Sequence, residues 1–279
     1  MTSVDQGGWT NRKRRLFLPD GRPMAFVDSG GQGPVLLLLH GYSDSSRSFS
    51  LLEPHLEGYR LVIPDLPGHG ASAADDGLTV ADFADDVAAF LAALSIDRCI
   101  VVGHSMGAMI GMELSALLGR KIKALVSISG ALRPAFPQGD IVTEAVMGFS
   151  DPIDPTDPFF NLWHACPHPV DTTFLTFLRH EAAAIPSTIW QGILREFTSL
   201  DLTDTAKSIS TPVLCIAGSA DTLFHARYRN DLTSALSQPQ IVLLEGVGHN
   251  PHWENPSHVA LCIERFARTG TVESSIGDA

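Results

Sequence analysis

Residues 99–107 read Cys-Ile-Val-Val-Gly-His-Ser-Met-Gly, and this stretch decides the fold of the chain. The apolar residues before Gly103 predict a buried strand, and the apolar spacing that begins at Met106 predicts a helix. Glycines two positions before and after Ser105 permit a tight turn between the two elements and close packing of the helix on the strand. Ser105 is then presented at a helix N-terminus, where free N–H groups favour negative charge, and it is our candidate nucleophile.

Outward from this turn, strand and helix patterns alternate along most of the chain. Continuous apolar runs are typical of strands buried on both faces of a parallel sheet. The predicted strands are residues 35–39, 61–64, 99–102, 124–128, 212–217 and 241–244, and the predicted helices are residues 49–56, 79–94, 106–118, 226–236 and 256–267. Residues 13–18 and 24–28 predict an N-terminal hairpin around the turn Asp20-Gly21. The predicted fold class is therefore α/β, with a mostly parallel sheet and helices on both faces.

The alternation stops between residues 131 and 209. This segment contains eight prolines, separated by mostly helical patterns that are rich in aromatic residues. We predict that it forms a mainly helical cap over the carboxyl ends of the strands, inserted into a core domain made of residues 1–130 and 210–279. Its aromatic side chains, among them Trp163 and Trp190, are expected to contribute an apolar wall to a small-molecule pocket.

A serine hydroxyl is a poor nucleophile without a base, and the base needs an acid to orient it. Asp221 and His249 each follow a predicted strand in the last third of the chain, so both are expected at the same sheet edge as Ser105. The chain order Ser, Asp, His is the one expected for this architecture. We therefore assign His249 as the base and Asp221 as its orienting acid. The alternatives are His252 for the base and Asp201 or Asp204 for the acid.

Negative charge that develops on a substrate carbonyl oxygen needs two backbone N–H donors. One is expected from Met106, the residue after the candidate nucleophile. The other is expected from the loop after residues 35–39, which reads His40-Gly41-Tyr42-Ser43. Gly41 permits a sharp turn there, which favours the N–H of Tyr42 over that of Ser43. The residues assigned to substrate binding are His40, Gly41, His104, Trp163 and Trp190.

These motifs together resemble those of a known family. The chain resembles the α/β-hydrolase superfamily, in particular its small capped serine esterases and lactonases, over nearly all residues outside the cap. The motifs that carry the resemblance are His40-Gly41, Asp65-Leu66-Pro67-Gly68-His69-Gly70, the turn at Ser105, the loop from Gly218 to Asp221, and Gly248-His249-Asn250-Pro251-His252. The resemblance implies an α/β-hydrolase fold and a structural role for residues 65–70. Ser105 stands where haloalkane dehalogenases and epoxide hydrolases carry Asp, which disfavours those activities, and Ala108 replaces a glycine found in many relatives.

The expected reaction is hydrolysis of a carboxylic ester or lactone of a hydrophobic or aromatic small molecule through an acyl-enzyme. A second hypothesis is hydrolysis of a carbon–carbon bond in a ring-cleavage product by the same three residues. His104 favours the esterase, since the carbon–carbon hydrolases often carry Asn before the nucleophile. A third hypothesis is a ligand receptor on the same scaffold, and the intact set of Ser105, Asp221 and His249 argues against a purely non-catalytic role.

Composition limits the partners of the chain. The formal net charge of −12 repels phosphate backbones, so we expect no nucleic-acid partner. The longest aliphatic run, residues 35–39, is too short to cross a membrane, and residues 1–15 contain no signal-like apolar stretch. Four cysteines in this context predict reduced thiols and a cytoplasmic location. We expect a monomer or homodimer.

No cofactor or metal ion is expected for this chemistry. Residues 164–168 form an H-x-C-x-H run that resembles a set of metal ligands. Prolines adjoin this run, and no fourth ligand lies nearby in the sequence, so it does not fit the usual spacing of a zinc site.

Overall fold

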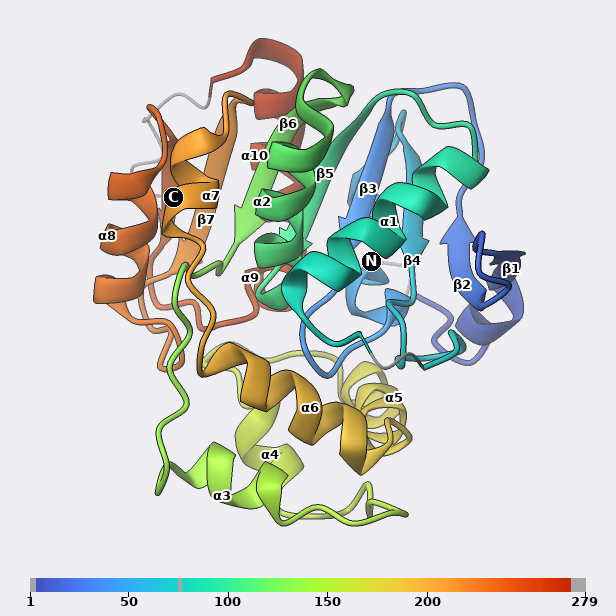
Figure 1. The fold of residues 1–279 in the computed structure, drawn as a ribbon, viewed down its shortest axis with the longest axis vertical. Helices are drawn as coiled ribbons and strands as arrows, with labels where there is room; N and C mark the ends of the chain where they lie inside the picture. Colours follow the sequence, from blue (N-terminus) through green and yellow to red (C-terminus); the bar gives the residue numbers. More distant parts are fainter. Residues whose placement is uncertain (1–3, 75–76, 272–279) are drawn as a thin grey trace.

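The computed structural model describes residues 4–74 and 77–271, and within them the chain forms one eight-stranded sheet (Figure 1). The strands are β1 (Arg14–Phe17), β2 (Pro23–Asp28), β3 (Val35–Leu39), β4 (Arg60–Pro64), β5 (Cys99–His104), β6 (Ile122–Ile128), β7 (Val213–Gly218) and β8 (Gln240–Leu244). Their order across the sheet is β1-β2-β4-β3-β5-β6-β7-β8. β1 and β2 form the predicted hairpin and β2 pairs antiparallel with β4, whereas the neighbours from β4 to β8 pair in parallel. The predicted mostly parallel α/β fold is confirmed.

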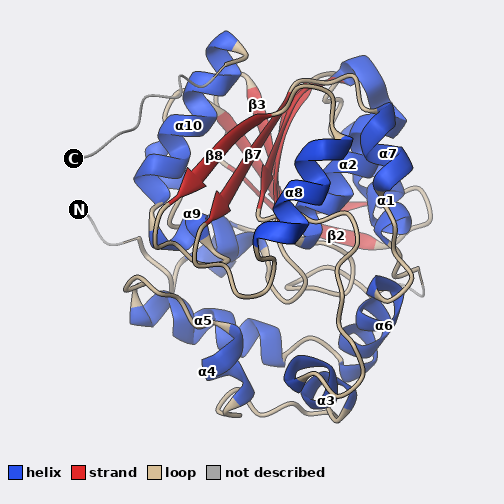
Figure 2. Ribbon diagram, turned by 90° about the vertical axis from the view of Figure 1, so that its left-hand side faces the viewer, coloured by secondary structure: helices blue, strands red, loops and turns tan. Residues whose placement is uncertain are grey.

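Helices cover both faces of this sheet (Figure 2). The helices on one face are α1 (Val80–Ala93), α2 (Met106–Leu118), α7 (Thr203–Ser208) and α8 (Ala226–Ala235), and α10 (Pro256–Thr269), preceded by the short α9 (Pro251–Glu254), covers the other. Successive strand residues alternate between the two apolar layers, so that in β3 Leu37 faces the α1 side and Leu38 faces the α10 side. Burial on both faces explains why the strands appear in the sequence as continuous apolar runs. Among the described helices, none is both long enough and apolar enough to cross a membrane.

One predicted helix differs from the structure. Residues 49–56 form parts of two short 3-10 helices, Ser46–Phe49 and Glu53–His55, in place of one α-helix. Pro54 has no N–H to donate within a longer helix. The side chain of Ser45 accepts the N–H of Arg47, which starts the first turn earlier than predicted. Two further 3-10 helices lie at Trp9–Arg12 and Gly119–Lys121.

Residues 131–209, which we call the cap segment, lie between β6 and β7. Four of their helices, α3 (Ile141–Met147), α4 (Phe159–Trp163), α5 (Thr172–Ala183) and α6 (Ser187–Phe197), form a layer beyond the carboxyl ends of the strands (Figures 1 and 2). α7, at the end of the same segment, packs beside α2 and α8, and Thr205 donates to Glu113 of α2 (2.9 Å). The layer from α3 to α6 therefore covers the sheet edge that carries the candidate site.

Candidate active site

Ser105 stands on a strained turn between β5 and α2. Its backbone has φ 52° and ψ −114°, a conformation that residues other than glycine rarely adopt. A Cβ on Gly103 would lie 2.2 Å from the carbonyl oxygen of Gly107, and a Cβ on Gly107 would lie 2.0 Å from that of Leu39. Only glycine therefore allows α2 to pack directly against β5 and β3 with Ser105 held at the sheet edge.

The hydroxyl of Ser105 belongs to a chain of three hydrogen-bonded side chains. Its Oγ lies 3.0 Å from Nε2 of His249, and Nδ1 of His249 lies 2.8 Å from Oδ2 of Asp221. Oδ1 of Asp221 accepts the N–H groups of Leu223 (2.9 Å) and Phe224 (2.8 Å). Burial raises the pKa of the Asp221 carboxyl, but the charge of His249 and these hydrogen bonds outweigh it and lower that pKa. An ionised Asp221 favours His249 with Nδ1 protonated, so that Nε2 is free to accept a proton.

The alternative base and acids lie outside this chain of hydrogen bonds. His252 is fully buried, and its Nε2 lies 3.0 Å from Oγ of Ser48. Asp201 and Asp204 are exposed at the start of α7. The geometry therefore brings together the three residues that were assigned from the sequence and leaves the three alternatives apart.

Two backbone N–H groups were predicted to bind the oxyanion, and neither has an acceptor within the described part of the protein. One belongs to Met106, the first residue of α2, and the other to Tyr42 on the loop after β3. The carbonyl oxygen of Tyr42 accepts from Nε2 of His69 (2.7 Å), and its phenol donates to the carbonyl oxygen of Trp190. The loop is thus fixed from the core and from the cap segment, while both N–H groups remain available.

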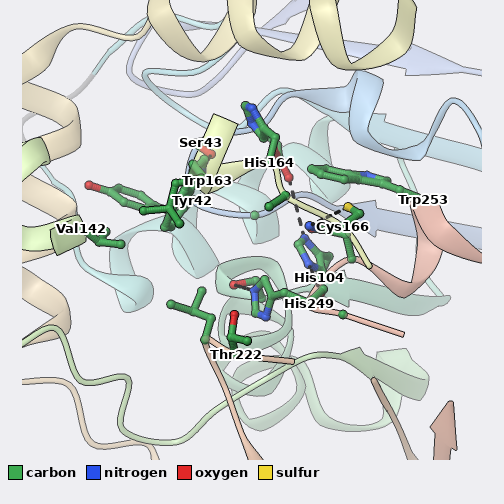
Figure 3. A pocket seen from close by; sticks show the side chains of 18 of the residues that line it. Tyr42, Ser43, His104, Val142, Trp163, His164, Cys166, Thr222, His249 and Trp253 are labelled. Atoms are coloured by element: carbon green, nitrogen blue, oxygen red, sulfur yellow. Dashed lines mark hydrogen bonds and ion pairs between the residues drawn. The ribbon is translucent and has the colours of Figure 1, made fainter. Parts of the chain in front are cut away.

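A cavity of about 590 Å³ lies above Ser105, between the core and the cap segment. Figure 3 shows an apolar side, with Tyr42, Val142 and Trp163, and a more polar side, with His104, His164 and Cys166. Further apolar lining residues are Phe136, Ile141, Leu162, Leu223 and Trp253. This size and lining are typical of a site for a small organic molecule.

Three of the five residues assigned to substrate binding, Gly41, His104 and Trp163, line this cavity. Nε1 of Trp163 donates to Oγ of Ser43 (2.6 Å), which ties the cap segment to the loop after β3. Nε2 of His104 donates to the carbonyl oxygen of His249 (3.0 Å). His104 therefore both borders the cavity and supports the loop that carries the candidate base.

The other two, His40 and Trp190, do not line the cavity, which corrects their assignment. Nε2 of His40 accepts the N–H of Leu66 (2.9 Å), Nδ1 donates to the carbonyl oxygen of Gly41 (2.8 Å), and burial lowers its pKa to about 4. Trp190 is fully buried against Tyr42, with ring centroids 4.9 Å apart. Both side chains hold loops in place, so they shape the site without reaching it.

Sequence reasoning missed several polar residues in the cavity wall, above all Asp44. Its side chain is only 5% exposed, two residues beyond the candidate oxyanion donor Tyr42. Cys166 and Asn250 also line the cavity, and Nδ2 of Asn250 lies 3.8 Å from Sγ of Cys166. The available signal was the position of Asp44 on the loop that supplies the oxyanion donor, since side chains of that loop end near the reacting serine.

The H-x-C-x-H run does not gather into a metal site. His164 and Cys166 line the cavity, whereas His168 is exposed. Within residues 4–74 and 77–271, no group of three or more His, Cys, Asp or Glu side chains is placed to hold a metal ion.

The sequence profile of the alpha/beta hydrolase fold family matches residues 34–256, a range that includes Ser105, Asp221 and His249. This chain belongs to the alpha/beta hydrolase family. The matched range of this alpha/beta hydrolase begins just before β3 and extends to the first residue of α10. It therefore covers the loop with the candidate oxyanion donor, the turn at the candidate nucleophile and the whole cap segment.

Curated relatives of this alpha/beta hydrolase include a biotin biosynthesis protein and a methyl ester esterase. It is similar to the biotin biosynthesis bifunctional protein BioHC of Cellvibrio japonicus, with 26% identity over 250 residues that cover 85% of this chain and 48% of that protein. The chain thus spans about half the length of that relative. It is also similar to the pimeloyl-[acyl-carrier protein] methyl ester esterase of Yersinia pseudotuberculosis, with 26% identity over 263 residues that cover 85% of this chain and 95% of that protein.

Solved structures show the same architecture. This alpha/beta hydrolase is similar to an esterase from Exiguobacterium antarcticum, with a TM-score of 0.81 and 17% identity over 91% of this chain and 99% of that one. At this level of identity the likeness concerns the fold. Family membership and the esterase-like relatives together support hydrolase chemistry for this chain.

Proposed function

We propose that this alpha/beta hydrolase is a serine hydrolase that cleaves a carboxylic ester or lactone of a hydrophobic or aromatic small molecule. The observation that carries the proposal is the position of His249, 3.0 Å from Oγ of Ser105 and 2.8 Å from Oδ2 of Asp221. A serine hydroxyl with such a base and orienting acid is activated for attack on a carbonyl carbon. The similarity to a methyl ester esterase supports an ester as the bond that is cleaved.

In the first half-reaction, Oγ of Ser105 bonds to the carbonyl carbon while its proton passes to Nε2 of His249. The carbonyl oxygen becomes an oxyanion and accepts the N–H groups of Tyr42 and Met106. The bond to the alkoxide then breaks as His249 returns the proton to it, so that an alcohol leaves and the acyl group stays on Ser105. Asp221 remains ionised and stabilises the imidazolium that forms transiently on His249.

In the second half-reaction, a water molecule gives a proton to His249 and its oxygen attacks the acyl carbon. Collapse of the second oxyanion breaks the bond to Ser105, which takes the proton back from His249, and a carboxylic acid leaves. The same steps open a lactone, since the leaving alcohol is then part of the acyl group and the product is a single hydroxy acid.

Proton release tests this proposal, because each turnover yields one acid. In weak buffer, we expect the wild-type protein to release protons from short and long aryl esters or from lactones, and the Ser105→Ala protein to release none. Ser115→Ala is a control in α2, the helix that follows Ser105, since the hydroxyl of Ser115 is buried and donates to the carbonyl oxygen of Gly111 (2.6 Å). Release that persists in Ser105→Ala would refute the mechanism.

Silence across the whole panel from folded wild-type protein would also count against the proposal. It would favour the carbon–carbon hydrolase or the receptor, the two alternatives that the sequence leaves open. A ring-cleavage diketone acid, assayed by loss of its absorbance, distinguishes between them, since only the enzyme consumes it.

A further inference from the structure

Three buried side chains in one wall of the cavity carry polar atoms without a hydrogen-bond partner. The buried atoms without a partner are both ring nitrogens of His164 and Nδ1 of His104. The neighbouring carboxylate of Asp44 accepts from the hydroxyl of Ser48 at Oδ2, and no donor among the described residues reaches its Oδ1. The side chains of His104 and Asp44 are 4% and 5% exposed, and His164 is 3% exposed. Buried polar groups in native proteins nearly always have partners, so this set points to a ligand group that completes it.

The side chains of Asp44, His104 and His164 line the same cavity as Ser105. Oδ2 of Asp44 lies 3.7 Å from Nδ1 of His104, and a Cβ on Gly41 would lie 3.0 Å from that nitrogen and 3.2 Å from that oxygen. Figure 3 shows His104 and His164 on the same side of the cavity, together with Trp253. The ring of Trp253 has its centroid 6.2 Å from that of His104 and 6.0 Å from that of His164.

The unpartnered atoms are mainly acceptors. Because Nε2 of His104 donates to the carbonyl oxygen of His249, its Nδ1 carries a lone pair when the ring is neutral. Burial lowers the pKa of His104 and lowers that of His164 to about 4, so both rings are neutral at pH 7 and His164 offers one acceptor nitrogen. Burial raises the pKa of the Asp44 carboxyl, but the interaction with the facing ring of His104 outweighs it and lowers that pKa overall, with smaller contributions from His40 and His164. The wall thus presents three acceptor atoms without a partner, one of which is an oxygen of the Asp44 carboxylate.

None of the described residues that line the cavity is Lys or Arg, so no such side chain offsets this carboxylate within the cavity wall. Arg179 is not part of the lining. Its positive charge adds a smaller contribution to the effect of burial, which lowers the pKa of His164. The hydroxyl of Ser48 is the one side-chain donor to Asp44 in the described residues, at 3.0 Å from Oδ2. An unpaired buried charge costs free energy, which a cationic ligand group would recover.

We propose that Asp44, His104 and His164 form a subsite that binds a hydrogen-bond-donating cation of the substrate, best a primary ammonium group, next to the reacting serine. This inference rests on the proposed function, since it takes the cavity as the substrate site. An ammonium group carries three N–H donors, which match the three acceptor atoms in number. The indole of Trp253 also attracts a nearby cation through its ring face.

The subsite defines the substrate class more narrowly than the fold does. It favours esters or lactones that carry an amino group and disfavours those that carry a carboxylate, because Asp44 repels a second negative charge. Anionic ring-cleavage products are therefore poor candidates for this cavity.

Binding to the Ser105→Ala protein tests the subsite without turnover. Calorimetry at pH 7.5 would compare three ligands with the same aryl-alkyl skeleton: 3-phenylpropylamine, 3-phenylpropanol and 3-phenylpropanoate. We expect the amine to bind roughly 10- to 100-fold more tightly than the carboxylate, with the alcohol between them. An alcohol that binds as tightly as the amine would overturn the assignment of a cation, and equal or tighter binding of the carboxylate would overturn the subsite.

Matched variants then locate the effect. In the same background, Asp44→Asn should weaken amine binding by roughly 10-fold. Asp140→Asn removes the other carboxylate of the lining and retains a residue that caps α3, so it should weaken amine binding by less than about 3-fold. An equal loss in both variants would mean that only the general negative field attracts the amine, which contradicts the proposal. Because binding requires no catalysis, a failed proton-release assay and a failed subsite give different results.

Discussion

Arg47 and Glu181 form an ion pair that joins the core to the cap segment. The side chain of Arg47 is 1% exposed, and its Nη2 lies 2.7 Å from Oε1 of Glu181 on α5. The same guanidinium donates from Nη2 to Oγ1 of Thr10 (3.2 Å), and Oγ of Ser45 donates to Oε2 of Glu181 (2.6 Å). This network fixes α5 beside the 3-10 helix Ser46–Phe49, which follows the loop with the candidate oxyanion donor. The position of the cap segment is therefore tied to the position of that loop.

Removing one partner of this pair should destabilise the protein. Glu181→Ala leaves a buried guanidinium without its counter-charge, and we expect the free energy of unfolding in urea to fall by about 3 kcal/mol. Glu57→Ala, at an exposed position, should change it by less than about 0.5 kcal/mol. If the two variants unfold alike, the ion pair does not hold the cap segment.

The orienting role of Asp221 predicts a large catalytic defect in Asp221→Asn. The amide can no longer stabilise the imidazolium of His249 or favour the required tautomer, so kcat for a hydrolysed ester should fall by about 10⁴-fold with little change in KM. The control is Asp201→Asn, which changes an exposed carboxylate at the start of α7. A defect of similar size in the control, or activity retained in Asp221→Asn, would refute the assignment.

The buried histidines predict a loss of stability in mild acid. Burial lowers the pKa of His40 and of His164 to about 4, whereas a histidine in the unfolded chain takes up its proton near pH 6.5. Between these values the unfolded state binds more protons, so stability is complete above about pH 6.5 and is lost as the pH falls toward 4. At pH 5 each of these two histidines lowers the free energy of unfolding by about 2 kcal/mol.

Urea unfolding at pH 7.5 and pH 5.0 measures this effect. Between the two pH values, the free energy of unfolding of His164→Gln should fall by about 2 kcal/mol less than that of the wild-type protein, because one buried neutral histidine is removed. His168→Gln changes an exposed histidine nearby, and its free energy of unfolding should fall by as much as that of the wild-type protein. A wild-type stability that does not change between the two pH values would show that these rings are not held neutral.

Much of the fold could be predicted from the sequence because its cues are local. The predicted bounds of residues 35–39 and 106–118 coincide with β3 and α2, since a doubly buried strand and a helix that follows a glycine turn have sharp limits. The predicted helix at 49–56 fails because serine side chains and Pro54 favour short 3-10 turns there, and helical spacing alone does not register that competition.

The candidate site, like the fold, could be predicted from the sequence only in part. Chain order and strand ends were enough to select Ser105, Asp221 and His249, because parallel strands bring their carboxyl ends to one edge. The direction of a side chain could not be predicted from the sequence. Trp190 is predicted to line the cavity, whereas it lies outside the lining and its carbonyl oxygen accepts the phenol of Tyr42. The sequence places Asp44 on the loop of the candidate oxyanion donor, but it does not indicate that the carboxylate is buried in the cavity wall.

The nucleophilic role of Ser105 is tested most directly by intact-protein mass spectrometry after reaction with a fluorophosphonate. An activated serine displaces fluoride from phosphorus and gains the phosphonyl group as a stable covalent adduct. We predict a single adduct on wild-type protein, located on the peptide that contains Ser105, and no adduct on Ser105→Ala. An adduct that persists in Ser105→Ala, or folded wild-type protein that gains no mass, would contradict the account.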